Sequence, residues 1–219
     1  QYDYKETFFL SGSYRRDASS CFAPGHRWGN FGSVGAAWQI TKMDFMKDIK
    51  WINFLKLKLS YGIQGNDGVG YYTWADRYTA SYNEETGEYT LNMSQKGNEN
   101  LTWESSKSWN LGLDFALFNH HLNGSVEFYH RATSDMLYFR SLPLSSGVSA
   151  SGYYDNIGSM YNRGVEITLN ANIFRTRNFK WDLDLNLTHN ANKITDLGGE
   201  EVRGGYTILY EGGSAYQAY

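Results

Sequence analysis

Two pairs of side chains have types and spacing that could support chemistry. His120 and His121 could ligate a metal, but neighbouring residues on a strand turn point in different directions and do not converge on one ion. Asp182 and Asp184 lie two residues apart, which puts both carboxylates on one face of a strand, as in paired acids of glycoside hydrolases. A catalytic pair needs an apolar pocket that raises the pKa of one acid. We therefore interpret these acids as solvated side chains.

Two further motifs lead to the same prediction. The segment Gly65–Gly70 (GNDGVG) has the glycine content of a phosphate-binding loop, but no helical pattern follows it, so a turn is expected. Cys21 is the single cysteine and has no disulfide partner within the chain. The sequence predicts no enzyme, with no catalytic residue, metal site or cofactor.

The elements that carry these residues are segments of alternating hydrophobicity. The clearest is Asn100–Tyr138, where apolar and polar residues alternate from Trp109 onward and resume after a short polar turn at 119–121. Side chains of a strand switch faces at every residue, whereas a helical period of about 3.6 would mix the two sets. The segment therefore predicts one long β-hairpin.

Strand length separates a soluble sheet from a membrane barrel. A soluble strand has about five or six residues, and a tilted strand that crosses a bilayer needs about nine to eleven. The run from Trp109 to Phe118 alone has the second length. We predict an all-β, antiparallel transmembrane β-barrel wall, and we expect its apolar positions to face lipid: Trp109, Leu111, Leu113, Phe115, Val126, Phe128, Val165, Ile167, Leu169, Leu183, Leu185 and Leu187.

The composition agrees with this interpretation. The 219 residues include 7 Trp, 18 Tyr and 12 Phe, which suits a protein with two interfaces between water and hydrocarbon. The mean hydropathy of −0.55 excludes helical membrane spans but is compatible with a barrel, in which every second wall residue is polar. A net charge of −3, from 20 basic and 23 acidic residues, gives no broad positive field and argues against a nucleic-acid partner.

The connections between the predicted strands alternate in length. Long polar segments span 64–99, with a small hairpin around Glu85–Gly87, and 139–156, whereas short turns are expected at 119–121 and 175–178. About seven strands joined in this way are typical of an outer-membrane barrel, whose long loops face outward. Because bacterial barrels normally have an even number of strands, we expect a larger barrel than this chain provides.

Three other segments carry expectations. A short helical turn is expected within Met43–Asn53, and the glycine-rich segment 196–219 is expected to begin another crossing. The first ten residues lack the features of a signal peptide. Either the protein is not exported, or the chain starts inside a longer precursor.

The outward loops contain the residues that we expect to bind a substrate or a partner protein. Aromatic side chains offer a large contact area at a small entropy loss, and their rings stack on sugars or pack against a protein. The alternative is that they complete the aromatic girdle of the barrel. The candidates are Tyr71, Tyr72, Trp74 and Tyr78 in the first long loop, and Tyr153 and Tyr154 in the second.

Several motifs, in their order and spacing, add a resemblance to a known family. They are Arg16-Asp17 with RWGNF at 27–31, SYG at 60–62 with Gly65-Asn66, NLTWE at 100–104, and NIGSM at 156–160 with NRGVE at 162–166. Over essentially its whole length the chain resembles SusC/RagA-like TonB-dependent outer-membrane transporters. Residues Ala18–Cys21 depart from the family pattern, which usually has a glycine and a basic residue there.

The resemblance implies more than the residues themselves predict. It implies that 1–219 is part of the β-barrel domain of a larger protein, with about 22 strands around a plug. The plug and the segment that TonB contacts would lie outside this chain. It further implies a bacterial outer-membrane location and import of oligosaccharides or peptides, with a SusD-like surface lipoprotein and TonB as partners.

Two other function classes stay open from the residues alone. A passive porin or an adhesin barrel would share every wall feature but need neither a plug nor a TonB segment. A soluble glycan-binding β-sandwich would also have many aromatic residues, but its strands would be about half as long.

Overall fold

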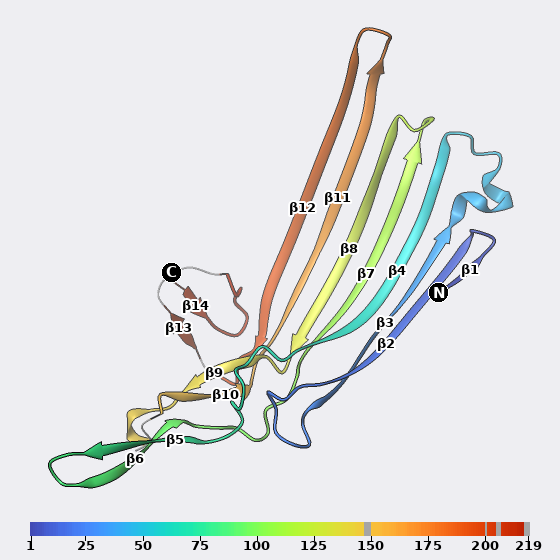
Figure 1. Cartoon of the computed structure of the whole chain (residues 1–219). Helices are drawn as coiled ribbons and strands as arrows, with labels where there is room; N and C mark the ends of the chain where they lie inside the picture. The colour runs from blue at the N-terminus through green and yellow to red at the C-terminus, as the bar shows by residue number, and fades with distance from the viewer. Residues whose placement is uncertain (147–149, 200, 205–206, 217–219) are drawn as a thin grey trace.

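The computed structural model describes residues 1–146, 150–199, 201–204 and 207–216. Its main feature is one antiparallel sheet in the order β1-β2-β3-β4-β7-β8-β11-β12, which curves but does not close (Figure 1). The strands of this sheet are β1 (Tyr2–Tyr4), β2 (Phe8–Ala18), β3 (Trp28–Gln39), β4 (Ile52–Asn66), β7 (Glu104–Leu117), β8 (Leu122–Ser134), β11 (Ser159–Arg175) and β12 (Lys180–Asp196).

The strands are long. Apart from the three-residue β1, the strands of this sheet have between 11 and 17 residues, well above the usual length in soluble sheets. This confirms the prediction of an all-β antiparallel wall whose strands are long enough to cross a bilayer. None of the helices in the described ranges is long and apolar enough to cross a membrane.

The register gives the sheet one apolar face. Residues directly opposite each other on antiparallel neighbours share a face, and one row across the sheet contains Leu10, Ala36, Leu59, Leu111, Phe128 and Val165. A neighbouring row contains Trp38, Leu57, Leu113, Val126, Ile167 and Leu187. The prediction that the apolar positions of successive strands lie on one face is therefore confirmed.

The opposite face is polar and carries charges of both signs. Lys58 on β4 is the centre of one cluster, since its Nζ lies 2.8 Å from Asp114 Oδ1 and 2.8 Å from Glu127 Oε1. Gly112 lies between Lys58 and Glu127 in the register, and a Cβ there would come within 2.9 Å of Lys58 Cε. The absence of a side chain at Gly112 lets the lysine reach across the intervening strand.

Short turns lie at one end of the sheet and long connections at the other (Figure 1). Residues 118–121 join β7 to β8 and residues 176–179 join β11 to β12, close to the predicted turns. The segment between β3 and β4 contains η2 (Asp44–Met46), which confirms the helical turn expected within Met43–Asn53, and a further turn before it, η1 (Ile40–Lys42). We call these two ends of the sheet the short-turn end and the long-loop end.

The long connections contain structure of their own. Residues 67–103 include the hairpin of β5 (Arg77–Asn83) and β6 (Glu88–Gln95). This confirms the hairpin predicted around Glu85–Gly87, and the observed hairpin extends well beyond these residues. Residues 135–158 include β9 (Leu137–Ser141), η3 (Leu144–Ser146) and β10 (Gly152–Asn156).

In the described residues beyond β12, the two strands pair with each other and not with the main sheet, so the crossing expected to begin within 196–219 is not found there. These strands are β13 (Val202–Gly204) and β14 (Thr207–Leu209), after which the chain bends back toward β12. Ile194 donates to the Gly213 carbonyl at 2.8 Å and accepts from the Gly212 amide at 2.9 Å. These bonds hold the segment against the end of β12, so that the segment folds back instead of extending the sheet.

Candidate functional site

The long connections are anchored by an aromatic cluster at the long-loop end. Phe22 and Leu101 are the largest fully buried side chains in the described structure. The Trp103 ring packs edge-on against Phe22 at 5.4 Å and Phe31 at 5.1 Å between centroids, and its Nε1 donates to the Arg27 carbonyl at 2.9 Å. This cluster fixes the end of the first long connection to the loop that joins β2 and β3.

Two glycines make room for the cluster. A Cβ at Gly29 would come within 2.4 Å of the Phe31 ring, and a Cβ at Gly65 within 2.1 Å of the same ring. Both distances are shorter than any side chain tolerates, so neither position accepts a larger residue without movement of the ring. The RWGNF motif and the Gly65-Asn66 pair thus meet in space although they are far apart in the sequence.

Two asparagines join the first long connection to the second. The Asn156 side chain accepts from the Thr102 amide at 2.7 Å and donates to the carbonyls of Thr102 and Asp135, each at 2.9 Å. Asn98 Nδ2 donates to the Tyr154 carbonyl at 3.1 Å and to Asp155 Oδ1 at 3.0 Å. The segments that carry the predicted binding residues are therefore held together at their bases.

The predicted residues of the first connection differ in exposure. Tyr71 and Tyr72 have 74% and 62% of their surface exposed, whereas Trp74 is half-buried. Gln95 Nε2 donates to the carbonyls of Tyr72 at 2.9 Å and Ala75 at 3.0 Å, which ties this segment to the end of β6. Tyr71, Tyr72 and Tyr78 are the exposed members of this group.

Asp76 closes the base of the β5–β6 hairpin. Its Oδ1 accepts from the Gly97 amide at 2.7 Å and lies 3.2 Å from Lys96 Nζ. The Gly97 amide, with Lys96 beside it, lowers the pKa of Asp76 below its ordinary value of 3.8. The clamp is therefore strongest when Asp76 is ionised.

The β5–β6 hairpin has an exposed apolar face that the sequence prediction captured only at Tyr78. The register places Tyr78 beside Met93, Ala80 beside Leu91, and Tyr82 beside Tyr89, with the last two rings 4.9 Å apart. We call this set of residues the hairpin face. Its large members are exposed by 55% to 74%: Tyr78, Tyr82, Tyr89 and Leu91. Figure 1 shows the hairpin extending away from the sheet.

Tyr82, Tyr89 and Leu91 were not among the predicted site residues. The signal was present, because Tyr78, Ala80 and Tyr82 alternate with polar residues. An isolated two-stranded hairpin is marginally stable in water. An uncovered aromatic face on such a hairpin suits a contact surface for another protein.

The predicted residues of the second connection lie on β10. Tyr153 and Tyr154 are half-buried, and the Tyr154 ring packs edge-on against Phe139 at 5.4 Å. None of the ring contacts among the described residues joins these tyrosines to the first group. The two connections that carry these groups are joined by the Asn98 side chain, which donates to the Tyr154 carbonyl, and not by the rings.

A groove with a volume of about 450 Å³ lies on the polar face. Its walls offer hydroxyl, amide and charged groups, which suit a solute with many hydrogen-bonding groups. They include Ser108, Asn110, Glu127, Tyr129, Arg131, Asn162, Glu166 and Tyr216.

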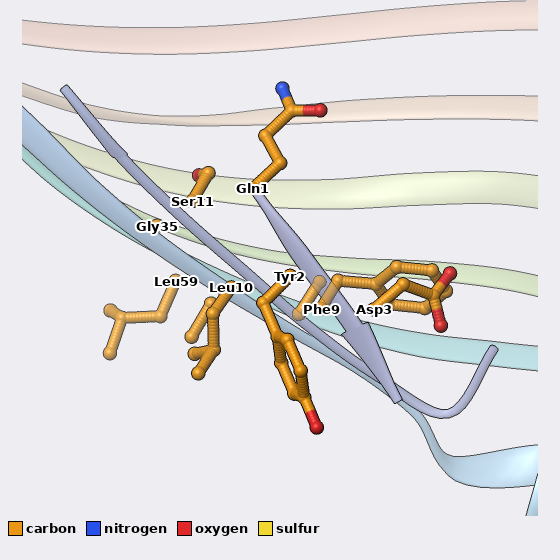
Figure 2. Close-up of a pocket in the computed structure, with 10 residues that line it drawn as sticks. Gln1, Tyr2, Asp3, Phe9, Leu10, Ser11, Gly35 and Leu59 are labelled. Carbon is orange, nitrogen blue, oxygen red and sulfur yellow. The ribbon is translucent and has the colours of Figure 1, made fainter. Parts of the chain in front are cut away.

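Another pocket, of about 390 Å³, wraps around the free edge of the sheet beside β1 (Figure 2). Figure 2 shows Tyr2, Leu10 and Leu59 projecting from one side of the ribbons, and the register places them in one apolar row. Ser11 and Gly35 line the same pocket from the polar face. A membrane wall needs a neighbouring strand at such an edge, because unpaired backbone groups are costly in lipid, so we assign no ligand to this pocket.

Three of the four side chains that could have supported chemistry have polar partners of their own. His121 Nδ1 lies 3.0 Å from the Asn172 carbonyl, and Asp184 Oδ1 accepts from Asn170 Nδ2 at 2.5 Å. Arg175 Nε lies 3.6 Å from Asp182 Oδ1. Within the residues that the structure places, no group of three or more His, Cys, Asp or Glu side chains is arranged to hold a metal ion.

Comparison with known proteins gives consistent matches. The family model "TonB dependent receptor-like, beta-barrel" matches residues 1–212. The chain is 37% identical to TonB-dependent receptor P39 of Formosa agariphila over 222 residues, which cover 100% of this chain and 21% of that receptor. It is 35% identical to TonB-dependent receptor SusC of Bacteroides thetaiotaomicron over 205 residues, 90% of this chain and 20% of SusC.

The fold matches a solved structure equally well. The structure of the RagAB peptide transporter superposes with a TM-score of 0.85 at 33% identity, over 95% of this chain and 23% of the matched chain. The chain spans about a fifth of the length of the curated relatives that it matches.

Proposed function

The chain belongs to the TonB-dependent receptor family, and from this premise we propose that it forms part of the β-barrel domain of an outer-membrane nutrient importer. In this proposal, residues 1–219 supply one stretch of the wall of a longer receptor in the outer membrane of a Gram-negative bacterium. The plug and the segment that contacts TonB belong to other parts of that receptor. The family consists of receptors and transporters rather than enzymes.

The observation that carries the proposal is the division of the sheet into two faces. Successive long strands place apolar residues on one face and residues with charges of both signs on the other. A wall between lipid and a water-filled or plugged lumen requires this division. In this orientation the apolar face meets lipid, the polar face meets the lumen, and the long-loop end lies outside the cell.

We propose an oligosaccharide or a peptide as the imported solute. The similarity to the RagAB peptide transporter supports a peptide, and the resemblance to the SusC/RagA branch supports either class. The polar groove, with hydroxyl, amide and charged groups around Asn110 and Glu127, suits both. TonB would supply the work of import through a part of the receptor outside this chain.

A SusD-like surface lipoprotein is the proposed partner at the long-loop end. The hairpin face offers exposed tyrosines and a leucine that no other part of the described chain covers. Large aromatic side chains are the typical anchors of protein interfaces. Tyr71, Tyr72, Trp74, Tyr153 and Tyr154 remain proposed contacts for the solute or the lipoprotein.

Substitutions on the two faces of the hairpin test the partner assignment in the full-length receptor. Replacement of Tyr82, Tyr89 and Leu91 by alanine should abolish co-purification of the lipoprotein. The matched control replaces Thr79, Ser81 and Thr90 by alanine on the opposite face of the same hairpin, and it should leave co-purification intact. If both triple variants retain the lipoprotein, the hairpin face is not its docking surface.

The solute assignment has a separate test. Replacement of Tyr72, Trp74 and Tyr154 by alanine should reduce growth on the imported oligosaccharide or peptide while the barrel keeps its resistance to heat and detergent. If uptake and lipoprotein association both persist, these aromatic residues belong to the girdle or to loop packing. Specificity then lies in other parts of the receptor.

A further inference from the structure

The apolar face carries a set of cations at one place. On this face of β7, β8, β11 and β12 the basic side chains are Lys107, Arg163 and Lys193, and no Asp or Glu is paired on the face from the row of Lys107 to the short-turn end. Asp196 is paired with Ser159 beyond that row, after a register irregularity at the end of β12. Each of the three basic residues lies in the half of its strand that is nearer the long-loop end. His130 and His189 lie on the same face beside them. We call these five residues the basic patch.

The register brings the patch together from four strands. Trp109, His130 and Arg163 are paired in one row, and Lys107, Ala132, Tyr161 and Lys193 are paired in the next. The His130 ring stacks between Trp109 at 6.0 Å and Tyr161 at 5.6 Å, and the Arg163 guanidinium lies 5.5 Å from the Tyr161 ring. The rings therefore form a stacked platform among the cations.

The cations of the patch are exposed and lack carboxylate partners. Lys107, Arg163 and Lys193 are exposed, and in the described part of the chain none of them forms a salt bridge with an acid. Lys58 on the polar face differs, because two carboxylates lie beside it. Three unneutralised cations on neighbouring strands of a lipid-facing wall need either water or an anion nearby.

A groove with a volume of about 450 Å³ adjoins the cations on this face. Trp109, Phe128, Val165 and Ala191 line it with apolar groups, and Arg163 and His189 add basic groups. An apolar channel beside basic groups is complementary to a lipid, which has an acyl chain below a charged headgroup. Phosphate oxygens accept charge-assisted hydrogen bonds from arginine and lysine.

We propose that the basic patch binds the phosphate group of a membrane lipid in the leaflet at the long-loop end, with an acyl chain of that lipid along Phe128 and Val165. The inference rests on the proposed function in one respect, that the apolar face stands in the outer membrane. It assigns the receptor a bound lipid in addition to its solute. The long-loop end then meets a leaflet that contains phosphorylated lipid.

The test uses the full-length receptor reconstituted in phosphatidylcholine nanodiscs with and without lipid A, a phosphorylated glycolipid. The variant replaces Lys107, Arg163 and Lys193 by glutamine, which leaves a shorter polar side chain and removes the charge. Each basic residue near an anionic headgroup contributes about a five-fold factor in affinity, so the triple variant should bind lipid A about a hundred-fold more weakly. The wild-type affinity should also fall as salt concentration rises.

Two control variants carry the same type of substitution at other places. Arg131→Gln lies on the polar face of β8, next to His130 in the sequence, and Arg16→Gln lies on the apolar face at β2, where Arg16 stacks on Trp28 at 4.7 Å. Both controls should bind lipid A as the wild type does. A salt-insensitive affinity, or a triple variant that binds lipid A as tightly as the controls, would overturn the proposal.

Failure of the inference is distinguishable from failure of the proposed function. If the wild-type receptor fractionates with the outer membrane and imports its solute but binds no lipid A, the patch only reaches interfacial water and the lipid site is refuted alone. If the receptor is absent from the outer membrane fraction, the proposed function fails first and the lipid site fails with it. Resistance of the folded barrel to heat and detergent identifies any variant that has not folded. In that case the pairwise variants Lys107→Gln with Lys193→Gln replace the triple variant, with an expected reduction of about 25-fold.

Discussion

A charge at the centre of the apolar face should destabilise the receptor far more than the same charge one residue away. Ile167 is the central residue of β11, which has 17 residues, and its neighbours in the register are Val126 and Leu187. Thr168 follows it on the polar face, between Ser125 and Asn186. The substitutions Ile167→Arg and Thr168→Arg therefore add the same side chain to opposite faces at the same depth.

The difference between the two variants follows from the membrane. An arginine on the lipid face at the midplane of a bilayer costs about 2 to 4 kcal/mol, whereas a lumen-facing substitution leaves the charge in a polar environment. A cost of that size corresponds to a change of about 30-fold to nearly 1000-fold in the folding equilibrium. Thr168→Arg also places its charge on the polar face, which carries the acids Glu127 and Glu166.

Denaturant titration of the full-length receptor in lipid vesicles measures both free energies of unfolding. Ile167→Arg should lower the free energy of unfolding by about 2 to 4 kcal/mol, and Thr168→Arg should change it by less than about 1 kcal/mol. Equal losses in the two variants, or a larger loss for Thr168→Arg, would refute the assignment of the faces. A receptor that stays in the aqueous phase without lipid would refute the membrane wall itself.

Two further predictions concern the long-loop end. Gly65→Ala should destabilise the aromatic cluster by about 1 to 3 kcal/mol, because the added Cβ would lie 2.1 Å from the Phe31 ring. The loss should appear as faster proteolysis of residues 67–103. Gly87→Ala is the comparison for backbone strain alone, because a Cβ there meets nothing within 4 Å although Gly87 has a positive φ. Acid should loosen the base of the β5–β6 hairpin, because the pKa of Asp76 is lowered in the folded protein. The stabilisation that ionised Asp76 gives to the hairpin base is complete above the ordinary pKa of 3.8, and it is lost as the pH falls below 3.8 through the folded pKa. Pepsin cleavage between residues 76 and 97 should therefore increase below pH 3.8 in the wild type, and Asp76→Asn should remove this pH dependence; an unchanged profile in Asp76→Asn would contradict the role of the clamp.

Much of the wall was readable from the sequence because its signals are local. Side chains of a strand alternate between faces whatever the strand pairs with, so the alternation around Trp109 and Leu183 predicted the faces directly. Strand length and the alternation of long and short connections are also properties of the chain itself. They predicted the barrel wall and the positions of the turns near 119–121 and 175–178.

The candidate site was only partly readable. Tyr71, Tyr72 and Tyr78 were predicted as loop aromatics and are exposed. Tyr82 and Tyr89 were missed, because the polar composition of 64–99 concealed a short alternating pattern. Contacts of these residues with a solute or a lipoprotein form only in the assembled receptor, and uptake and co-purification of the proposed variants test them.

Tertiary structure alone decided which distant residues meet. β4 pairs with β7 across a connection of 37 residues (67–103), and this pairing brings Gly65, Phe31 and Trp103 into one cluster. The basic patch likewise draws Lys107, Arg163 and Lys193 from strands that become neighbours only through the register. The periodicity of the sequence determines the face of the sheet on which a side chain lies. The pairing of the strands determines which side chains are its neighbours on that face, and this pairing depends on contacts between segments far apart in the chain.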